Sequence, residues 1–432
     1  MTAAKMERVA ERVRNKQAVV VGAGKSGLAA AELLLRLGAR VALADAKPDL
    51  DPAALGPLAG KLELRLGAHT PAQFADADLV VLSPGVAAKK IAEALAPVAP
   101  QNVVAELEFA SWFLEAPVLA ITGTNGKTTT TTLVSQMLTD AGKTVFTGGN
   151  IGTPLCRFIL DGSRADVVVL EVSSFQLQNC QSFAPRVGVL LNFAANHLDY
   201  HADMEEYLAA KLNLFARMEE SGLAILPEEM RATLEQRNFT KARKVWFGPT
   251  DRIPAPHLPG AHNRANVEAA WQAAGAFGVS LESARATAEA FHPLAHRLQA
   301  VGEKKGVLFV DDSKSTTLDS TAAAVQSFER PVRLLLGGVF KGGDVAGLIP
   351  ALTGRVVEIA LFGAAREVFE PILAGRFPLT WEPDLERAVR RLWTSAKPGD
   401  VLLLSPATAS FDAYKGYAAR GDHFQRIVKE LA

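Results

Sequence analysis

Cysteine is nearly absent from this 432-residue sequence, which contains only Cys156 and Cys180. Two cysteines in so long a chain exclude a disulfide framework, and their spacing is not that of a metal site. Neither sign of charge dominates, because 46 Lys and Arg residues balance 46 Asp and Glu residues. The balance excludes a global positive field for nucleic acid or an anionic membrane surface, although local basic pockets are still allowed.

Long hydrophobic runs are absent as well. No uninterrupted apolar stretch approaches the roughly 20 residues that cross a bilayer as a helix. Residues 1–17 mix charged with small apolar residues and lack the apolar region of a signal peptide. The sequence therefore predicts a cytoplasmic protein with no membrane insertion and no nucleic-acid partner.

Short runs rich in Val, Leu and Ile alternate with helical segments through almost the whole chain. Such runs suit strands of parallel sheets buried on both faces, and the length suffices for two or three domains. The expected strands form three sets: 18–21, 40–44 and 79–82; 118–122, 144–147, 167–170, 187–192, 224–226 and 245–247; 307–310, 332–336, 356–362 and 401–404. Breaks near 100–108 and 292–297 separate the sets, so we predict an α/β fold of three domains with mainly parallel sheets.

The first set carries a dinucleotide-binding fingerprint. The strand at 18–21 runs into GAGKSG at residues 22–27, a helical pattern follows, and the next strand leads to Asp45. This spacing places a pyrophosphate at a helix N-terminus. Taken alone it suits an NAD- or flavin-dependent oxidoreductase, so the rest of the chain has to decide which nucleotide is bound.

The second set begins with a phosphate-binding loop, GTNGKTT, at residues 123–129. The backbone N–H groups of such a loop, and the helix N-terminus that follows it, attract phosphate oxygens. Lys127 is expected to reach the terminal phosphates of ATP, and the Thr128 hydroxyl to ligate Mg²⁺. The strict motif fails at one position, where Ile121 replaces glycine. The alternative is a glycine-rich turn with a surface lysine.

Acidic and histidine side chains follow the next strands of this set. Glu171 comes at the carboxyl end of its strand, where open α/β sheets place ligands, and its carboxylate suits Mg²⁺. The next strand leads to Asn192, His197, Asp199 and His201. His197 and His201 have the spacing of a zinc pair, but no Glu follows the first histidine as it does in zinc proteases. A hydrogen-bonded loop histidine is the other interpretation.

The combination of segments resembles the Mur ligases, the ATP-dependent amino-acid ligases of peptidoglycan-precursor synthesis. The matching segments occur in the family's order: GTNGKTT, the Glu after VVVL, NHLD, AAKLNLF, LPGAHNRAN, AHRLQ, DDSKSTT and SPATASFDAY. The resemblance covers nearly the whole chain. It implies a monomer with a Rossmann-like domain for a UDP-sugar (1–105), a central P-loop-type ATPase domain (106–293) and a Rossmann-like C-terminal domain for the amino acid (294–432).

The resemblance also implies a reaction. D-Glutamate would be joined to UDP-N-acetylmuramoyl-L-alanine through an acyl phosphate, with ATP, two Mg²⁺ sites and a CO₂-derived carbamate on Lys211. From the residues alone, Lys211 would be a solvated helix lysine. The implied positions for catalysis and for the metal ions are Lys127, Thr128, Glu171, His197 and Lys211.

The positions matched to the three substrates form three groups. Around ATP the resemblance implies Gly123, Thr124, Asn125, Gly126, Lys127, Thr128, Thr129, Asn263, Asn266, Arg297 and Asp312. Around the UDP-substrate it implies Gly24, Ser26, Asp45, Lys47, Gly85 and Asn150. Around D-glutamate it implies Lys314, Thr316, Lys341, Ser410, Phe411 and Tyr417.

Three other functions stay open on the sequence. One is a non-catalytic nucleotide-binding regulator, against which the full complement of matched catalytic positions argues. A related Mur or folylpolyglutamate-type ligase would use a different acceptor amino acid, and the pocket around Lys341 and Ser410 would decide between acceptors. An NAD-dependent oxidoreductase would rest on residues 22–45 alone. It would leave the phosphate loop, Glu171 and the whole third domain without a role.

Overall fold

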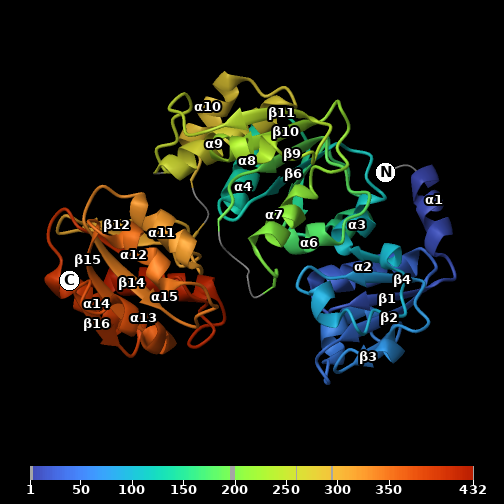
Figure 1. Ribbon diagram of the computed structural model, residues 1–432, viewed down its shortest axis with the longest axis horizontal. Helices are drawn as coiled ribbons and strands as arrows, with labels where there is room; N and C mark the ends of the chain where they lie inside the picture. Colours follow the sequence, from blue (N-terminus) through green and yellow to red (C-terminus); the bar gives the residue numbers. More distant parts are fainter. Residues whose placement is uncertain (1–2, 195–199, 259, 293–294, 432) are drawn as a thin grey trace. The chain divides into compact units, whose positions relative to one another are not determined.

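The structure, a computed structural model, is an α/β fold with three sheets whose strands are mainly parallel (Figure 1). It describes residues 3–194, 200–258, 260–292 and 295–431. The predicted fold class is confirmed. Within the described ranges, no helix combines the length and the apolar character needed to cross a membrane.

The first sheet has the strand order β3-β2-β1-β4-β5, and all its pairings are parallel. Its strands are β1 (Gln17–Val21), β2 (Arg40–Asp45), β3 (Glu63–Leu66), β4 (Leu79–Leu82) and β5 (Val103–Ala105); α1 (Ala3–Val13) precedes it, and α2 (Lys25–Arg36) joins β1 to β2. Every residue of β1 is buried, as the apolar run predicts. The strand order reverses between β1 and β4, which is where open α/β sheets bind ligands.

The central sheet has the order β11-β10-β9-β6-β8-β7, again with parallel pairings. Its strands are β6 (Val118–Thr122), β7 (Val145–Gly149), β8 (Val167–Glu171), β9 (Val187–Leu190), β10 (Leu223–Pro227) and β11 (Arg243–Phe247). The helices of this part are α3 (Glu106–Ser111), α4 (Lys127–Asp140), α5 (Leu155–Leu160), α6 (Ser174–Gln178), α7 (Met204–Leu212), α8 (Arg231–Glu235), α9 (Ala261–Gly275) and α10 (Leu281–Ala290). The strand β6 lies between β8 and β9. The residues that follow these two strands, where candidate ligands are expected, therefore flank the loop after β6 on both sides.

The third sheet has the order β12-β13-β17-β14-β15-β16, in which only the β12–β13 pairing is antiparallel. Its strands are β12 (Gln299–Lys304), β13 (Val307–Asp311), β14 (Val332–Gly337), β15 (Val356–Phe362), β16 (Leu379–Glu382) and β17 (Val401–Leu404). Its helices are α11 (Leu318–Gln326), α12 (Ile349–Leu352), α13 (Arg366–Leu373), α14 (Leu385–Ser395) and α15 (Tyr417–Glu430). Two separate apolar clusters include residues of the sheet and of these helices.

The chain forms two compact units, one holding the first two sheets and the other holding the third. Within the first unit, one continuous hydrophobic core includes residues of both sheets. Polar contacts also join α2 to α5: Arg157 pairs with Glu32 at 2.6 Å, and Arg36 Nη1 donates to the Leu160 oxygen at 2.8 Å. Each predicted domain range contains one sheet, and the boundaries near 105 and 293 stay predictions.

Four strands are not expected from the sequence: β3, β5, β12 and β16. All four lie at the outer edge of a sheet. Three of them, ELRL, QAVGEK and LTWE, mix polar with apolar residues and are partly exposed. The fourth has only three residues. The strands β3, β12 and β16 are partly exposed and lack the continuous apolar run that marks a central strand, and β5 is apolar and buried but too short to be recognised.

Candidate active site

The phosphate loop follows β6 directly and ends at α4. Gly126 precedes the helix with a φ of 79°, a left-handed conformation that favours glycine. Lys127 folds back over the loop, where its Nζ donates to the main-chain oxygens of Gly123 at 2.8 Å and Thr124 at 2.9 Å. The ammonium group therefore lies against the loop, on the first residue of a helix whose N-terminal end attracts phosphate.

Glu171 ends β8 and pairs in register with Ile121 of β6, next to the phosphate loop. Its side chain is buried, and Oε1 accepts a hydrogen bond from Asn150 Nδ2 at 2.8 Å. The other oxygen, Oε2, has no hydrogen-bond partner among the described residues. A buried carboxylate oxygen is costly without a partner, and a divalent cation is a partner that it prefers. The residue thus fits the Mg²⁺ role implied by the sequence.

Lys211 lies on α7 with only 1% of its surface exposed, so it is not a solvated helix lysine. Its Nζ donates to the Gly123 oxygen at 2.8 Å and lies 4.5 Å from the centre of the Tyr207 ring. Burial, together with the nearby charge of Lys127, holds the pKa of Lys211 well below its ordinary value. Two lysines from separate elements thus meet at one carbonyl of the phosphate loop.

Asn192, just beyond β9, contacts the same loop from the other side of β6. Its Oδ1 accepts hydrogen bonds from the main-chain N–H groups of Thr124 at 3.1 Å and Asn125 at 2.8 Å. The sequence places Asn192 at a strand end but does not indicate this contact. The strand order could have suggested it, because β9 and β8 flank β6.

Of the two histidines in the zinc alternative, only His201 lies within the described residues. His197 falls within 195–199, outside the described residues. His201 is buried, with Nε2 3.0 Å from Ser174 Oγ and Nδ1 3.4 Å from Gln178 Nε2. Its partners match the interpretation as a hydrogen-bonded histidine. Among the described residues, no group of three or more His, Cys, Asp or Glu side chains is arranged to hold a metal ion.

A pocket of about 390 Å³ lies over the dinucleotide-type turn in the first unit. It is lined by residues 22–26, Asp45, residues 83–86, residues 149–152 and Pro154. The structure therefore brings five of the six predicted UDP-substrate residues together, Asn150 of the central part included. The sixth, Lys47, is not among the lining residues.

Asp45 supports the turn beneath this pocket. Its Oδ2 accepts a hydrogen bond from the Ala23 N–H at 2.7 Å, and its Oδ1 accepts one from the Lys47 N–H at 3.0 Å. Gly27 lets the helix approach the turn closely, because a Cβ at this position would meet the Gly22 oxygen at 1.9 Å. The carboxylate thus fixes the turn's backbone, in addition to any contact with a ligand.

Five of the six predicted amino-acid residues lie on loops at the carboxyl ends of strands in the second unit, and the sixth, Tyr417, begins α15. Lys341 Nζ donates to Thr316 Oγ1 at 3.0 Å, and Lys314 Nζ lies 4.0 Å from the centre of the Tyr417 ring. The loop of Lys341 pairs with that of Ser410 through a bridge between Val339 and Ala409. Ser410 is buried, whereas Phe411 is 75% exposed.

Three of the four remaining predicted ATP residues are buried, and all three belong to the second unit, which includes α9 up to Val267. Asn263 and Asn266 lie on one face of α9, with Asn266 Nδ2 3.4 Å from Asn263 Oδ1. Asp312 follows β13, where its Oδ2 accepts a hydrogen bond from Ser405 Oγ at 2.8 Å. Its Oδ1 accepts one from the Leu298 N–H at 3.1 Å, which anchors the segment that carries Arg297.

Three models of Mur ligase domains match the chain in sequence order. The MurD-like N-terminal domain matches residues 16–104, the Mur ligase middle domain 121–254, and the glutamate ligase domain of Mur ligases 296–408. A UDP-N-acetylmuramoylalanine–D-glutamate ligase of Nitratidesulfovibrio vulgaris (strain DP4) is 51% identical over 418 residues, covering 96% of each chain. The chain belongs to the Mur ligase family. A protein of the same name from Desulfosudis oleivorans is 39% identical, covering 96% of this chain and 97% of that one.

Solved structures show the same Mur ligase fold at low identity. MurF ligase from Thermotoga maritima, in complex with ADP, matches with a TM-score of 0.60 and 19% identity over 98% of this chain and 97% of that one. A pseudomurein peptide ligase type C from Methanothermus fervidus matches with a TM-score of 0.59 and 16% identity over 97% of this chain and 100% of that one. At these identities the likeness concerns the fold alone.

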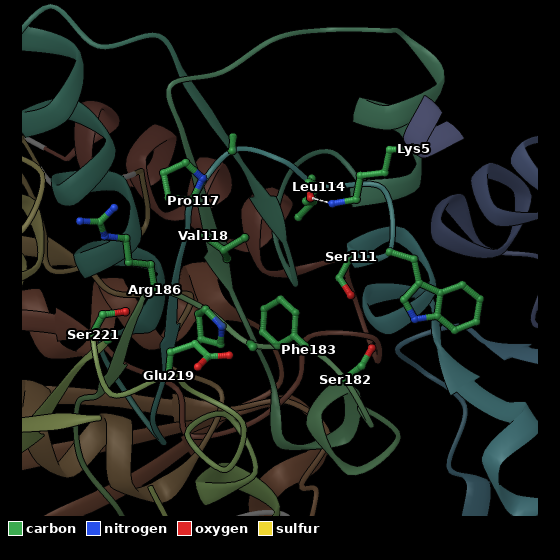
Figure 2. Close-up of a pocket in the computed structure, with 15 residues that line it drawn as sticks. Lys5, Ser111, Leu114, Pro117, Val118, Ser182, Phe183, Arg186, Glu219 and Ser221 are labelled. Atoms are coloured by element: carbon green, nitrogen blue, oxygen red, sulfur yellow. Dashed lines mark hydrogen bonds between the residues drawn. The ribbon is translucent and has the colours of Figure 1, made fainter. Parts of the chain in front are cut away.

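A second cavity of this Mur ligase, of about 520 Å³, contains none of the predicted site residues (Figure 2). It is lined by Lys5 of α1 and by segments that immediately precede β6, β9 and β10. It therefore lies at the amino edge of the central sheet, opposite the phosphate loop. Ligands of open α/β sheets bind outside the carboxyl ends of the strands, so the larger cavity is not the active site.

Asp312 is expected to make the stability of this Mur ligase depend on pH. Burial raises the pKa of Asp312 from 3.8 to about 7, and hydrogen bonds from Ser315, Ser405 and Leu298 only partly offset it. Because the folded state holds this proton more tightly than the unfolded state, the free energy of unfolding falls between about pH 4 and pH 7 and then levels off. A rise of this size corresponds to roughly 4 kcal/mol.

Asp312→Asn is therefore expected to raise the melting temperature at pH 8, relative to the original protein, and to have little effect near pH 4. The gain is smaller than the full 4 kcal/mol, because the amide cannot accept hydrogen bonds on both sides as the carboxylate does. Thermal unfolding of both proteins at several pH values measures the difference. A difference that does not change with pH would show that the carboxyl group is not the cause.

Proposed function

We propose that this chain is the ATP-dependent ligase that joins D-glutamate to UDP-N-acetylmuramoyl-L-alanine in the cytoplasmic synthesis of peptidoglycan precursors. The observation that carries the proposal is 51% identity, over 96% of both chains, to a protein of that name. The phosphate loop with Lys127, Glu171 and Lys211 around it supports the ATP-dependent chemistry. The products are UDP-N-acetylmuramoyl-L-alanyl-D-glutamate, ADP and phosphate.

The chemistry needs two successive displacements. The substrate carboxylate attacks the γ-phosphorus of ATP, which forms an acyl phosphate and releases ADP. The amine of D-glutamate then attacks the acyl carbon, and the tetrahedral intermediate expels phosphate as the amine loses a proton. The first step builds up negative charge on phosphoryl oxygens, and the second builds it up on the acyl oxygen and then on the departing phosphate. Lys127 and the first-turn N–H groups of α4 are the groups that we assign to the charge on the phosphoryl oxygens.

Glu171 and Thr128 are the residues that we assign to Mg²⁺, together with His197 and the modified Lys211 at a second site. Glu171 Oε2 has no hydrogen-bond partner within the described ranges, which supports this assignment. When bound, Mg²⁺ neutralises phosphate charge and orients the transferred group. Asn150 connects the proposed Mg²⁺ site to the 390 Å³ pocket. It lines that pocket, and its Nδ2 donates a hydrogen bond to Glu171 Oε1.

Lys211 is the residue that we assign to carbamylation. An ammonium group cannot ligate a cation, whereas the depressed pKa of Lys211 favours a neutral amine with a free electron pair. That pair can attack CO₂, forming an N–C bond and releasing one proton. The carbamate so formed is an anion with oxygen ligands of the kind that Mg²⁺ prefers.

We assign the 390 Å³ pocket to the UDP part of the muramyl substrate. Its glycine-rich turn and helix N-terminus suit a pyrophosphate, whether of UDP or of NAD. Asn150 and residues 149–152 come from the central part of the unit, and this supports the UDP-substrate because the reacting end must reach the phosphate loop. The NAD-dependent alternative assigns no function to Asn150 and residues 149–152.

The third-sheet loops are our candidate for the amino-acid site. Lys314 and Lys341 supply two positive charges, which suits a dicarboxylate such as D-glutamate. Residues 1–105, 106–293 and 294–432 are accordingly proposed as the UDP-substrate, ATP and amino-acid domains of a monomer. A different acceptor amino acid is the second candidate function, and the acceptor assay separates the two.

ADP release is expected only when UDP-N-acetylmuramoyl-L-alanine, ATP, Mg²⁺ and D-glutamate are all present. The assay supplies candidate amino acids one at a time, with L-glutamate as the matched control for the configuration of the acceptor. Equal rates with another amino acid would reject D-glutamate as the specific acceptor. Binding of NADH, but not of the UDP-substrate, at the residue 22–26 turn would reject the ligase altogether.

A further inference from the structure

Asn192 makes several hydrogen bonds with the phosphate loop, and no role has been assigned to them so far. It lies two residues beyond β9, whose last residue Leu190 pairs with Thr122 at the end of β6. The register therefore delivers Asn192 to the side of the loop away from Glu171, since β8 and β9 flank β6 on opposite sides.

The side chain of Asn192 uses both of its polar atoms on the loop. Oδ1 accepts from the N–H groups of Thr124 (3.1 Å) and Asn125 (2.8 Å), and Nδ2 donates to the Asn125 oxygen at 3.1 Å. The Asn192 main-chain oxygen also lies 3.2 Å from the Thr124 nitrogen. Two loop amides that could bind an anion thus face an asparagine.

Lys127 holds the same turn through its carbonyl groups. Its Nζ donates to the oxygens of Gly123 and Thr124, while Asn192 takes the N–H groups of Thr124 and Asn125. An ammonium has three N–H donors, so contacts with two or three phosphate oxygens would draw Lys127 away from these carbonyls. The contacts of Asn192, together with the hydrogen bond from Lys211 to the Gly123 oxygen, are then the ones that still fix the turn.

We propose that Asn192 is a positioning residue for ATP. It fixes the Thr124–Asn125 backbone, so that the turn presents the first-turn N–H groups of α4 and the released Lys127 to the phosphates. A helix N-terminus presents its first-turn N–H groups without intrahelical partners, and their direction is set by the turn before it. The inference rests on the proposed ATP role of this loop.

Asn192→Leu tests the proposal, because leucine has a similar size and makes no hydrogen bond. ATP binding by calorimetry is expected to weaken at least about tenfold, given the loss of more than one oriented hydrogen bond. The KM for ATP is expected to rise, while affinity for UDP-N-acetylmuramoyl-L-alanine stays within about twofold. Asn192→Ser, a milder change, is expected to lose part of the ATP affinity and serves if the leucine variant does not fold.

Gln181→Met is the matched control. Gln181 Nε2 donates to the main-chain oxygens of Pro100 and Val103, so this variant also loses side-chain amide hydrogen bonds in the same unit, but before β9 rather than after it. Unchanged ATP affinity in both Asn192 variants would overturn the proposal, as would an equal loss of affinity for ATP and the UDP-substrate. An original protein that binds no ATP would instead reject the proposed function.

Discussion

Lys127→Ala is expected to lower the rate of ADP release at least about a thousandfold while the protein stays folded. The ammonium is the side-chain charge that the loop itself offers to the transferred phosphoryl group, and one preorganised donor is worth about 10²–10³ in rate, more when it is charged. The loop keeps its shape without it. Lys211 still donates to the Gly123 oxygen, and Asn192 still holds the two neighbouring N–H groups.

The measurement is single-turnover and steady-state ADP release with thermal unfolding alongside. Lys241→Ala is a matched control, since Lys241 is an exposed lysine in the same unit and outside the proposed site. Lys127→Arg keeps a positive charge but not the compact ammonium that fits between two carbonyls. Near-normal turnover of Lys127→Ala in a folded protein would contradict the phosphate-loop assignment.

Lys211→Ala is expected to lose at least about a hundredfold in turnover and to regain much of it with short carboxylates such as formate, acetate or propionate. The substitution empties a buried position beside Tyr207 and the phosphate loop. A small carboxylate that enters this space restores the anionic oxygen that the carbamate is proposed to supply. Rescue therefore depends on the carboxylate concentration and on its size.

Chloride at equal ionic strength is the control for a salt effect. Incubation of the original protein with ¹³C-labelled bicarbonate provides a readout apart from activity, since a carbamate gives a carbon resonance that Lys211→Ala lacks. Full activity of Lys211→Ala without any carboxylate would contradict a catalytic role. A large loss that no carboxylate relieves, together with no labelled resonance in the original protein, would contradict the carbamate.

The sequence predicted an element best where the residues of that short segment alone determine its structure. The apolar runs of β1, β6, β8 and β17 are buried at every position, so hydrophobicity alone identifies them. The edge strand β12 contains Gln, Gly, Glu and Lys and is marked only by its pairing with β13. A segment whose partner is distant in the chain gives no comparable local signal.

The candidate site also contains residues that the sequence indicates locally and residues whose position depends on the tertiary structure. Residues 123–129 and 22–27 are indicated by spacing, because the glycines, the lysine and the helix N-terminus act within one turn. Lys211 is different, since a lysine on an ordinary-looking helix predicts a solvated side chain and the structure buries it. Only the packing of α7 against the loop after β6 brings its amine to the Gly123 oxygen.

By itself, the sequence determined an α/β fold, a nucleotide turn, a phosphate loop and, through the order of its motifs, a resemblance to the Mur ligases. Tertiary structure decided which distant groups meet. It placed Asn192 on the Thr124 and Asn125 amides, left Glu171 Oε2 without a hydrogen-bond partner in the described part of the chain, and brought Asn150 into the pocket of the first sheet. The reason is physical: hydrophobic periodicity and glycine spacing act within a few residues, whereas burial and hydrogen-bond partners depend on how separate strands pair in register.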